Sequence, residues 1–185
     1  MEFEDLGALA KHIEKVAKHV NGNLERAADR IGKNLAGTAQ AEIGKYQKEA
    51  GPFPAWADLA DSTEWNKMRH GYPVDAPLLA SGELRDSYSY TVEAHYSGPF
   101  VENINVIVGS TDPVAVYHEF GTSRMPPRPV LGPAVFRRKN YIAGQVYRAM
   151  EWAFMNYGAT WDISAKYDDP QTDVEYSPSG FYMRY

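Results

Sequence analysis

Residues 117–133 read Tyr-His-Glu-Phe-Gly-Thr-Ser-Arg-Met-Pro-Pro-Arg-Pro-Val-Leu-Gly-Pro and connect a short segment of helical character to a long one. The prolines fix φ along the second half of this stretch and lower the conformational entropy of the free loop. Beyond it, apolar residues recur every three or four positions from Tyr141 to Tyr157. This spacing predicts an amphipathic helix that begins at Gly132 or Pro133 and ends at Gly158.

Two strands and a short helix are predicted before this stretch. Apolar and polar residues alternate over 88–95 and again over 100–109, and Ser97-Gly98-Pro99 between them is a turn sequence. The alternation is typical of half-buried strands paired as a hairpin. Pro113 then favours the first turn of a helix over 114–120.

Helical spacing also dominates the first 48 residues. We expect an amphipathic helix over 2–20, a stop at Asn21-Gly22-Asn23, and a second helix from residue 24 to about 48. The glycines at 32, 37 and 44 weaken this second helix, so it is either kinked or held by a close neighbour. The segment 51–82 is irregular except for a short helix over 61–69, capped by Asp61 or Ser62, and Trp56 and Trp65 anchor it.

The expected fold class is therefore α+β. A small, mainly antiparallel sheet is packed by a long N-terminal helix and by the helix that follows the proline-rich loop, with one long irregular loop. Residues 1–158 form this single domain, and residues 159–185 form an extended tail rich in aromatic residues. Such a tail suits docking onto a partner or a neighbouring subunit, and a disordered terminus is the alternative.

Composition narrows the function classes. The 185 residues carry a net charge of −5, which argues against a general nucleic-acid binder. There is no cysteine, so disulfides and thiolate metal sites are excluded. No apolar run approaches the ~18 residues of a membrane span, and no N-terminal segment resembles a signal peptide. We expect a protein made in the cytoplasm, with no membrane partner.

No constellation of catalytic residues or metal ligands is evident, and we expect no enzymatic activity, no cofactor and no metal. His12 and His19 lie seven residues apart without a carboxylate pattern beside them, which makes a poor metal site. His118-Glu119 begins like a zinc-protease helix, but Thr122 stands where the second histidine is needed. A nucleophile elbow and a phosphate-binding glycine loop are both missing from the sequence.

Two motifs resemble those of bacteriophage neck and tail-completion proteins, a family of head–tail joining proteins of long-tailed phages. The first motif has the residues Tyr117, Phe120, Gly121, Thr122, Met125, Pro126, Arg128, Pro129, Leu131 and Pro133. The second, Pro77 to Ser87, includes Gly82, Leu84 and Arg85. The resemblance covers roughly residues 50–157, and the tail departs from the family pattern.

The resemblance implies a structural virion protein, located in the neck or tail, that forms a six- or twelve-fold homo-oligomeric ring. Such a ring joins head to tail beside portal-side and tail-tube or tail-terminator proteins, and DNA passes its lumen without specific binding. An assembly chaperone absent from the mature particle is the alternative, and a small hydrolase with an unrecognised site is a weaker one.

We assign two sets of residues to this function. The residues expected at subunit or partner interfaces are Arg124, Met125, Pro126, Pro127, Arg128, Arg137, Arg138, Trp161, Tyr167, Tyr176, Phe181 and Tyr182. Arg128 has an internal alternative, a tie to Glu119 or Glu83. The residues expected to shape the motifs are Tyr117, Phe120, Gly121, Thr122, Pro129, Leu131, Pro133, Gly82, Leu84 and Arg85. Among these, Phe120 is expected to be a core anchor and Gly121 to adopt positive φ.

Overall fold

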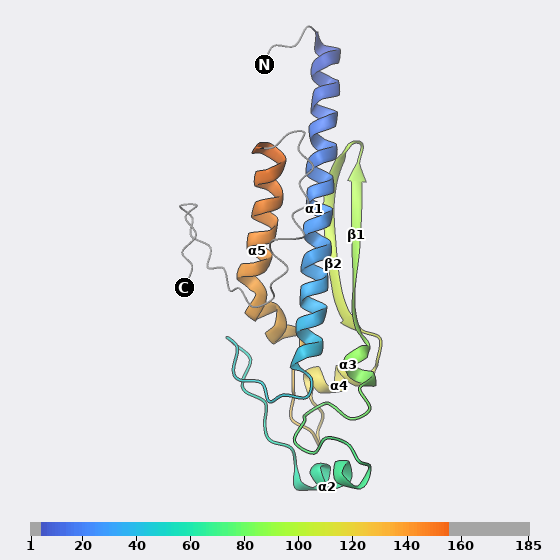
Figure 1. Cartoon of the computed structure of the whole chain (residues 1–185), viewed down its shortest axis with the longest axis vertical. Coiled ribbons are helices and arrows are strands. Elements are labelled where there is room, and N and C mark those ends of the chain that lie inside the picture. The colour runs from blue at the N-terminus through green and yellow to red at the C-terminus, as the bar shows by residue number, and fades with distance from the viewer. Residues whose placement is uncertain (1–4, 156–185) are drawn as a thin grey trace. The chain divides into compact units, whose positions relative to one another are not determined.

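The computed structural model describes residues 5–155 and has an α+β fold (Figure 1). A long helix comes first, and a two-stranded antiparallel hairpin and a second long helix follow it. The elements in chain order are α1 (Leu6–Glu42), α2 (Asp61–Arg69), α3 (Glu83–Asp86), β1 (Tyr88–Ser97), β2 (Phe100–Ser110), α4 (Val114–Phe120) and α5 (Leu131–Met155). None of the helices in this described range is long and apolar enough to cross a membrane.

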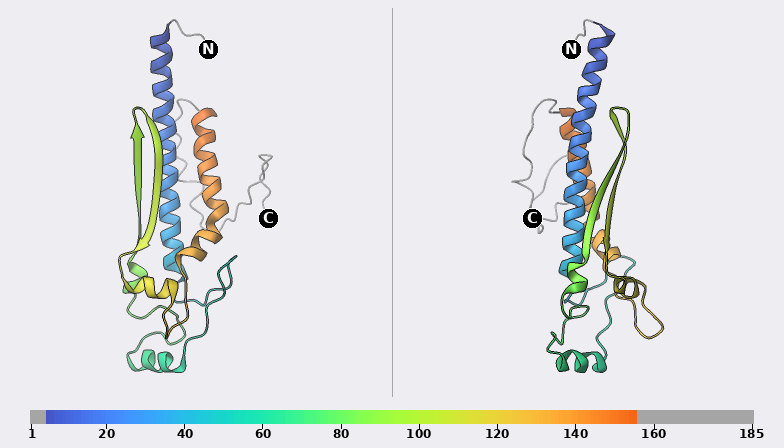
Figure 2. Two further views of the ribbon diagram at one scale, coloured as in Figure 1. Left: turned by 180° about the vertical axis from the view of Figure 1, so that it is seen from behind. Right: turned by 90° about the vertical axis from the view of Figure 1, so that its right-hand side faces the viewer.

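The chain forms two compact units, and α1, the hairpin and α5 contribute residues to both. Among the described residues, unit 1 contains 5–32, 91–107 and 140–155, and unit 2 contains 33–90 and 108–139. In unit 1, α5 runs along one side of α1 and the hairpin along another (Figures 1 and 2). The described apolar residues of unit 1 that are buried are mostly small, namely Ala17, Ala27, Ala28 and Ala149, together with Ile31.

The predicted interruption of the first helix at residues 21–23 is wrong, because α1 is continuous from Leu6 to Glu42. Asn21 does not cap a helix. Its side-chain amide donates to the Pro99 carbonyl at 2.8 Å, and its side-chain oxygen accepts from the Val101 N–H at 3.2 Å. The asparagine thus satisfies the backbone of the hairpin turn, and packing overrides a local stop signal.

The helix ends earlier than predicted, and a glycine ends it. Gly44 has φ +89, the left-handed conformation that terminates helices, and its N–H donates to the Pro77 carbonyl at 2.8 Å. Nothing lies within 4 Å of where a Cβ on Gly37 would stand, so that glycine does not admit a close neighbour.

Unit 2 has the larger apolar core. Ala39 and Ile43 of α1 pack there with Trp56, Tyr88 and Val130. Trp56 is therefore an anchor as predicted, whereas Trp65 is 57% exposed and stacks with Arg69, so its prediction as an anchor is wrong. The core joins the end of α1, the irregular segment, the start of the hairpin and the residues before α5.

The other predicted elements are confirmed. Along β1 the side chains of Tyr88, Tyr90, Val92 and Ala94 face inward, and Ser89, Thr91, Glu93 and His95 are exposed. Helix α2 starts where predicted, but neither Asp61 nor Ser62 caps it, since Ala60 is the N-cap residue and has no side-chain bond. Asp112 accepts from the Val114 N–H at 2.8 Å and so supports the first turn of α4.

A buried lysine organises the irregular segment 70–82. The Lys67 side chain is on α2, and only 8% of the residue is exposed. Its ammonium group donates to the carbonyls of Pro73 and Leu79 at 2.9 and 2.8 Å and also to the Ala76 carbonyl. Desolvation lowers the pKa of Lys67, and the charge of Asp75 partly opposes this effect. The cation replaces the hydrogen-bond donors that a regular element would supply to these carbonyls.

Candidate interaction site on the proline-rich segment

The segment 117–133, called here the motif segment, begins on α4 and ends on the first turn of α5. Glu119 links the two helices through its carboxylate. The carboxylate accepts from the N–H groups of Val130 at 2.8 Å, Leu131 at 3.3 Å and Gly132 at 3.2 Å. These N–H groups have no partner within α5, and a negative charge at a helix N-terminus is favourable. Glu119 is thus a non-local cap of α5.

Arg128 fixes the same segment from the other side. The residue is 5% exposed, and its guanidinium donates to the carbonyls of Ala57 at 2.9 Å and Asp58 at 2.9 Å. Its backbone N–H donates to the His118 carbonyl at 2.7 Å. Arg128 therefore acts inside unit 2, and the partners named in the sequence analysis, Glu119 and Glu83, are wrong. The guanidinium binds backbone carbonyls, which are left without donors in an irregular chain.

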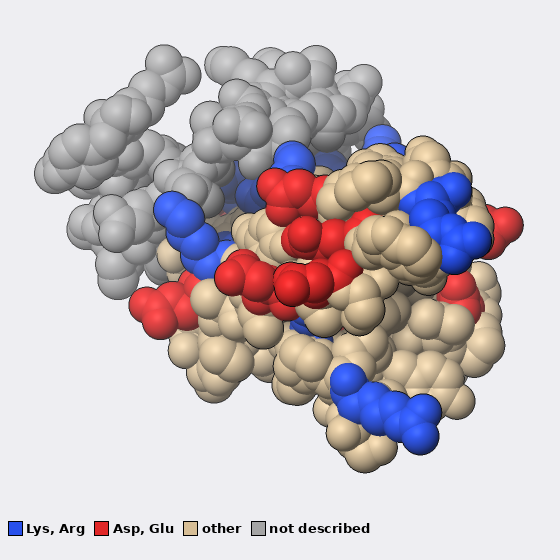
Figure 3. Space-filling model, turned by 90° about the horizontal axis from the view of Figure 1, so that it is seen from below, with Lys and Arg blue, Asp and Glu red and all other residues tan. Residues whose placement is uncertain are grey.

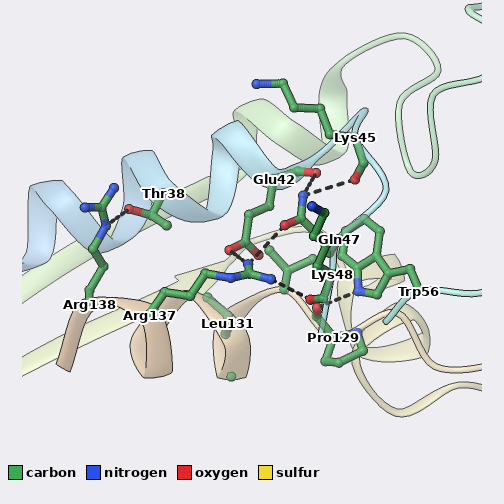
Figure 4. A network of polar contacts seen from close by, with 12 residues as sticks. Thr38, Glu42, Lys45, Gln47, Lys48, Trp56, Pro129, Leu131, Arg137 and Arg138 are labelled. Carbon is green, nitrogen blue, oxygen red and sulfur yellow. Dashed lines mark hydrogen bonds and ion pairs between the residues drawn. The ribbon is translucent and has the colours of Figure 1, made fainter. Parts of the chain in front are cut away.

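A third contact comes from Trp56. Its indole N–H donates to the Pro129 carbonyl at 3.1 Å, within the core of unit 2 (Figure 4). Pro129 and Pro133 are buried, and Leu131 is partly buried. The second half of the motif segment is therefore held by Trp56 from a distant part of the chain and by two side chains of the segment itself, Glu119 and Arg128.

The loop between α4 and Arg128 is a tight turn. Gly121 has φ +73, as predicted, and a Cβ there would stand 2.8 Å from the Pro127 nitrogen. Thr122 and Met125 exchange backbone hydrogen bonds of 2.9 and 3.3 Å, which places Ser123 and Arg124 at the tip. Arg124, Pro126 and Pro127 are exposed, and Met125 is partly buried. The loop projects from unit 2 in the right-hand view of Figure 2.

The outer face of α4 is apolar and exposed. Val116 is 56% exposed, Tyr117 57% and Phe120 79%, and these three residues share one side of the helix. We call them the α4 ridge. The prediction that Phe120 is a core anchor is wrong. Ala115 takes that role on the opposite side of α4, where it packs against the core cluster.

His118 lies on the buried side of the same helix. Its Nδ1 atom has no hydrogen-bond partner among the described residues. Burial lowers its pKa first, and the positive charge of Arg128 lowers it further. The imidazole is therefore kept neutral at neutral pH, which agrees with a structural position beside a buried guanidinium.

The arginines at the start of α5 are turned toward α1 in unit 2 (Figure 4). Arg137 forms an ion pair with Glu42 and donates to the Gln47 side chain at 3.0 Å and to the Lys48 carbonyl at 2.9 Å. Arg138 donates to the Thr38 hydroxyl at 3.1 Å. Both arginines were expected at an interface, and the structure places their guanidinium groups in contacts within this unit.

Glu42 is the electrostatically unusual member of this network. It is 5% exposed, and its Oε2 atom has no hydrogen-bond partner in the part of the chain that the structure describes. Burial raises its pKa to about 7, although the charge of Arg137 opposes the shift. This carboxyl group therefore titrates near neutral pH at the junction between the end of α1 and the start of α5.

The second motif forms a corner between the irregular segment and β1. Gly82 has φ +97 and is the N-cap residue of α3. Leu84 packs against the core cluster, whereas Arg85 is exposed and pairs with the neighbouring Asp86 at 2.8 Å. Ser81 accepts a long bond of 3.4 Å from the Glu83 N–H.

Sequence reasoning missed Glu119 as the cap of α5. The signal for it was indirect. No Ser, Thr, Asp or Asn stands just before Leu131, so the first N–H groups of α5 needed a distant acceptor. The predicted interface residues Trp161, Tyr167, Tyr176, Phe181 and Tyr182 lie outside the described residues, as does the predicted helix end at Gly158.

Across residues 5–155, no group of three or more His, Asp or Glu side chains is arranged to hold a metal ion. Comparisons with protein-family models, with curated proteins and with solved structures found no match to the chain. The features of the motif segment that bear on function are therefore its geometry and the resemblance of its residues.

Proposed function

We propose that the protein is a structural component of the phage head–tail connector, which assembles as a ring that joins the head to the tail. The observation that carries this proposal is the two-sided character of the motif segment. Its inner side is fixed by Glu119, Arg128 and Trp56, and its outer side exposes the α4 ridge and Arg124. An exposed apolar surface on a rigid support is typical of a protein-binding site.

Residue chemistry supports an interface on this side of α4. Aromatic residues and arginine are enriched at protein interfaces, and a few such residues carry most of the binding free energy. Tyr117, Phe120 and Arg124 are of these types and are exposed. The prolines of the loop keep it in one shape, so little conformational entropy is lost on binding.

The surface charge agrees with a ring whose lumen lets DNA pass. Acidic side chains gather near the middle of the face seen from below, with basic ones mainly toward its edges (Figure 3). Exposed acidic residues of the segment between α1 and β1 are Glu49, Asp58, Asp61, Asp75, Glu83 and Asp86. Because stable DNA binding needs cations against phosphates, an acidic wall would not retain DNA.

Cryo-electron microscopy of the phage particle that encodes this chain tests the proposal. The expected result is a ring of this chain between portal-side proteins and the tail tube, with residues 116–124 at a contact between subunits. A neck that is complete without this chain would overturn the proposal. The same result would favour the assembly chaperone, which should instead be found on unfinished particles.

A further inference from the structure

Unit 2 carries an apolar groove in addition to the α4 ridge. The groove is lined by Phe53, Leu131, Gly132, Val135 and Phe136, has a volume of about 470 Å³ and is open to solvent. Val135 is 45% exposed within it. Pockets of roughly 300–1,000 Å³ accept small ligands, so a groove of this size has room for an aromatic side chain.

Two close approaches between aromatic rings and glycines shape the groove. A Cβ at Gly132 would stand 2.4 Å from the Phe53 ring, and a Cβ at Gly51 would stand 2.2 Å from the Phe136 ring. A β-bridge between Ala50 and Phe53 closes a turn. Through these contacts the turn packs against the first turn of α5. The groove is a built feature whose walls are fixed by packing.

We propose that the α4 ridge of one copy of this chain docks into this groove on the next copy, with the Phe120 side chain inside it. The inference rests on the proposed function, because a ring needs a contact between two different surfaces of the same protein. The ridge and the groove are two such surfaces. Both belong to unit 2, and they lie on different sides of it, α4 on one and the 50–53 turn on another (Figure 1).

Charge complementarity favours a second copy as the occupant. Arg124 is exposed at the tip of the loop that follows the ridge, and Glu49 is exposed just before the turn that forms one wall of the groove. A cation also stands beside the groove, since the Lys139 ammonium lies 4.6 Å from the centre of the Phe136 ring. Arg124 is attracted by the charge of Glu49 and repelled by that of Lys139, so docking with the loop tip close to Glu49 is favoured.

The geometry also determines the symmetry of the contact. A ridge that enters a groove elsewhere on its neighbour is a heterologous contact, and repetition of this contact gives a closed ring or an open helical filament. A two-fold dimer would instead place α4 against α4. The two arrangements bring different pairs of residues together, so crosslinking distinguishes them.

Disulfide crosslinking has no background from native cysteines in this protein because the chain has none. We would prepare the full chain with Phe120→Cys and, separately, with Val135→Cys. After oxidation, we expect a disulfide dimer in the mixture and none in either variant alone. The double variant should give a ladder of oligomers. A mixture of Phe120→Cys with Glu102→Cys, which is exposed on β2 in unit 1, is the control.

Other outcomes overturn the inference. Efficient self-crosslinking of Phe120→Cys would show a two-fold contact at α4. A mixture that crosslinks no better than the control, both at high concentration and in assembled particles, would show that the groove is not the site. If no phage particle contains the chain, the connector proposal is overturned. The ridge–groove contact is then tested by crosslinking of the concentrated protein, and a crosslink in solution would still establish it.

Charge and shape variants give a quantitative test. Phe120→Asp should weaken self-association about 30-fold, which is typical of the loss of a central aromatic side chain. Met68→Asp, at an exposed apolar residue of α2, is the matched control and should change association little.

Arg124→Glu and Glu49→Arg should each weaken association, and their combination should restore it. Failure of the double variant to recover would overturn the proposed orientation.

Discussion

Units 1 and 2 bury different kinds of residue. In the part of unit 1 that the structure describes, the buried polar residues are neutral amides, Asn21 and Gln145, and the apolar ones are mostly alanines. In unit 2 the buried polar residues are all charged, namely Glu42, Lys67 and Arg128. The difference follows from the backbone. Long helices and a hairpin satisfy their own N–H and C=O groups, whereas irregular chain needs side-chain partners.

The two cations of unit 2 illustrate this need. Lys67 donates to carbonyls of residues 73–79, and Arg128 donates to those of residues 57 and 58. Neither forms an ion pair within residues 5–155 at the distance that defines one. Hydrogen bonds to charged groups contribute about 1.5–3 kcal/mol, more than bonds between neutral groups. Unit 2 therefore uses a few buried cations to hold long stretches of irregular chain in place.

The largest effect is expected for Lys67→Met. The substitution keeps an apolar side chain and leaves buried carbonyls without donors, so we expect the free energy of unfolding to fall by about 3 kcal/mol. Denaturant unfolding of the full chain measures this change. Lys45→Met, at an exposed lysine, is the matched control and should stay within ~0.5 kcal/mol of the original protein. A loss below ~1 kcal/mol for Lys67→Met would show that the cation does not hold residues 73–79.

Two glycines of α5 should respond with opposite signs. Gly132→Ala, in unit 2, would put a Cβ 2.4 Å from the Phe53 ring, and such overpacking costs about 2 kcal/mol. Gly144→Ala, in unit 1, meets only the end of the Arg148 side chain at 3.8 Å. There the helix should gain about 0.5–1 kcal/mol from the removal of glycine.

Thermal unfolding of the two alanine variants gives the comparison directly. A repacking variant, Gly132→Ala with Phe53→Leu, should recover part of the loss because the branched side chain can turn away from the new methyl group. Equal destabilisation by Gly132→Ala and Gly144→Ala would contradict the close approach of Phe53 to α5.

The ionisation of Glu42 should give unit 2 a pH dependence. Its folded-state pKa of about 7 lies above the ordinary value of 4.5, so the folded protein holds a proton that the unfolded chain has released. Stability therefore falls as pH rises from 4.5 to about 7 and is level above that. Glu42→Gln removes this term while keeping an acceptor for Arg137.

The measurement is the difference in unfolding free energy between Glu42→Gln and the original protein across this pH range. As pH rises, the unfolding free energy of Glu42→Gln should increase relative to that of the original protein by about 1.5 kcal/mol. This magnitude is reduced to allow for the screening of Arg137 by solvent. His118 acts in the opposite sense, because burial and Arg128 lower its pKa and stability is lost as pH falls. Its contribution cancels in the difference. A difference that stays constant with pH would contradict burial as the cause.

The sequence predicted the elements that depend on local periodicity. The alternation at residues 88–95 and the repeat after Pro133 identified the hairpin and α5, because one face of each is buried. The stop at residues 21–23 failed because Asn21 bonds to the hairpin turn, a partner that is 78 residues away in the chain. Local signals do not contain that contact.

The candidate site was predicted only in part. The motif segment and the positive φ of Gly121 were identified, whereas the orientation of α4 was not. Phe120 is the type of residue usually found in a core, and only the packing of Ala115 shows that the helix turns its other side inward. The donors and acceptors of Lys67, Glu119 and Arg128 lie in loops whose positions depend on the whole unit.

The smallest effect on stability is expected at the residue that we consider most important for assembly. Glu119 and Phe120 are neighbours, but one faces the start of α5 and the other is 79% exposed. Glu119→Ala should cost about 1 kcal/mol through loss of the helix cap, whereas Phe120→Ala should change stability by less than ~0.5 kcal/mol. Chemical denaturation of both variants beside a sedimentation assay of self-association separates the two roles. If Phe120→Ala destabilised the monomer as much as Glu119→Ala does, Phe120 would be part of the fold, and the α4 ridge would not be a free surface. If stability is unchanged while association weakens, the exposed ring serves contact between molecules.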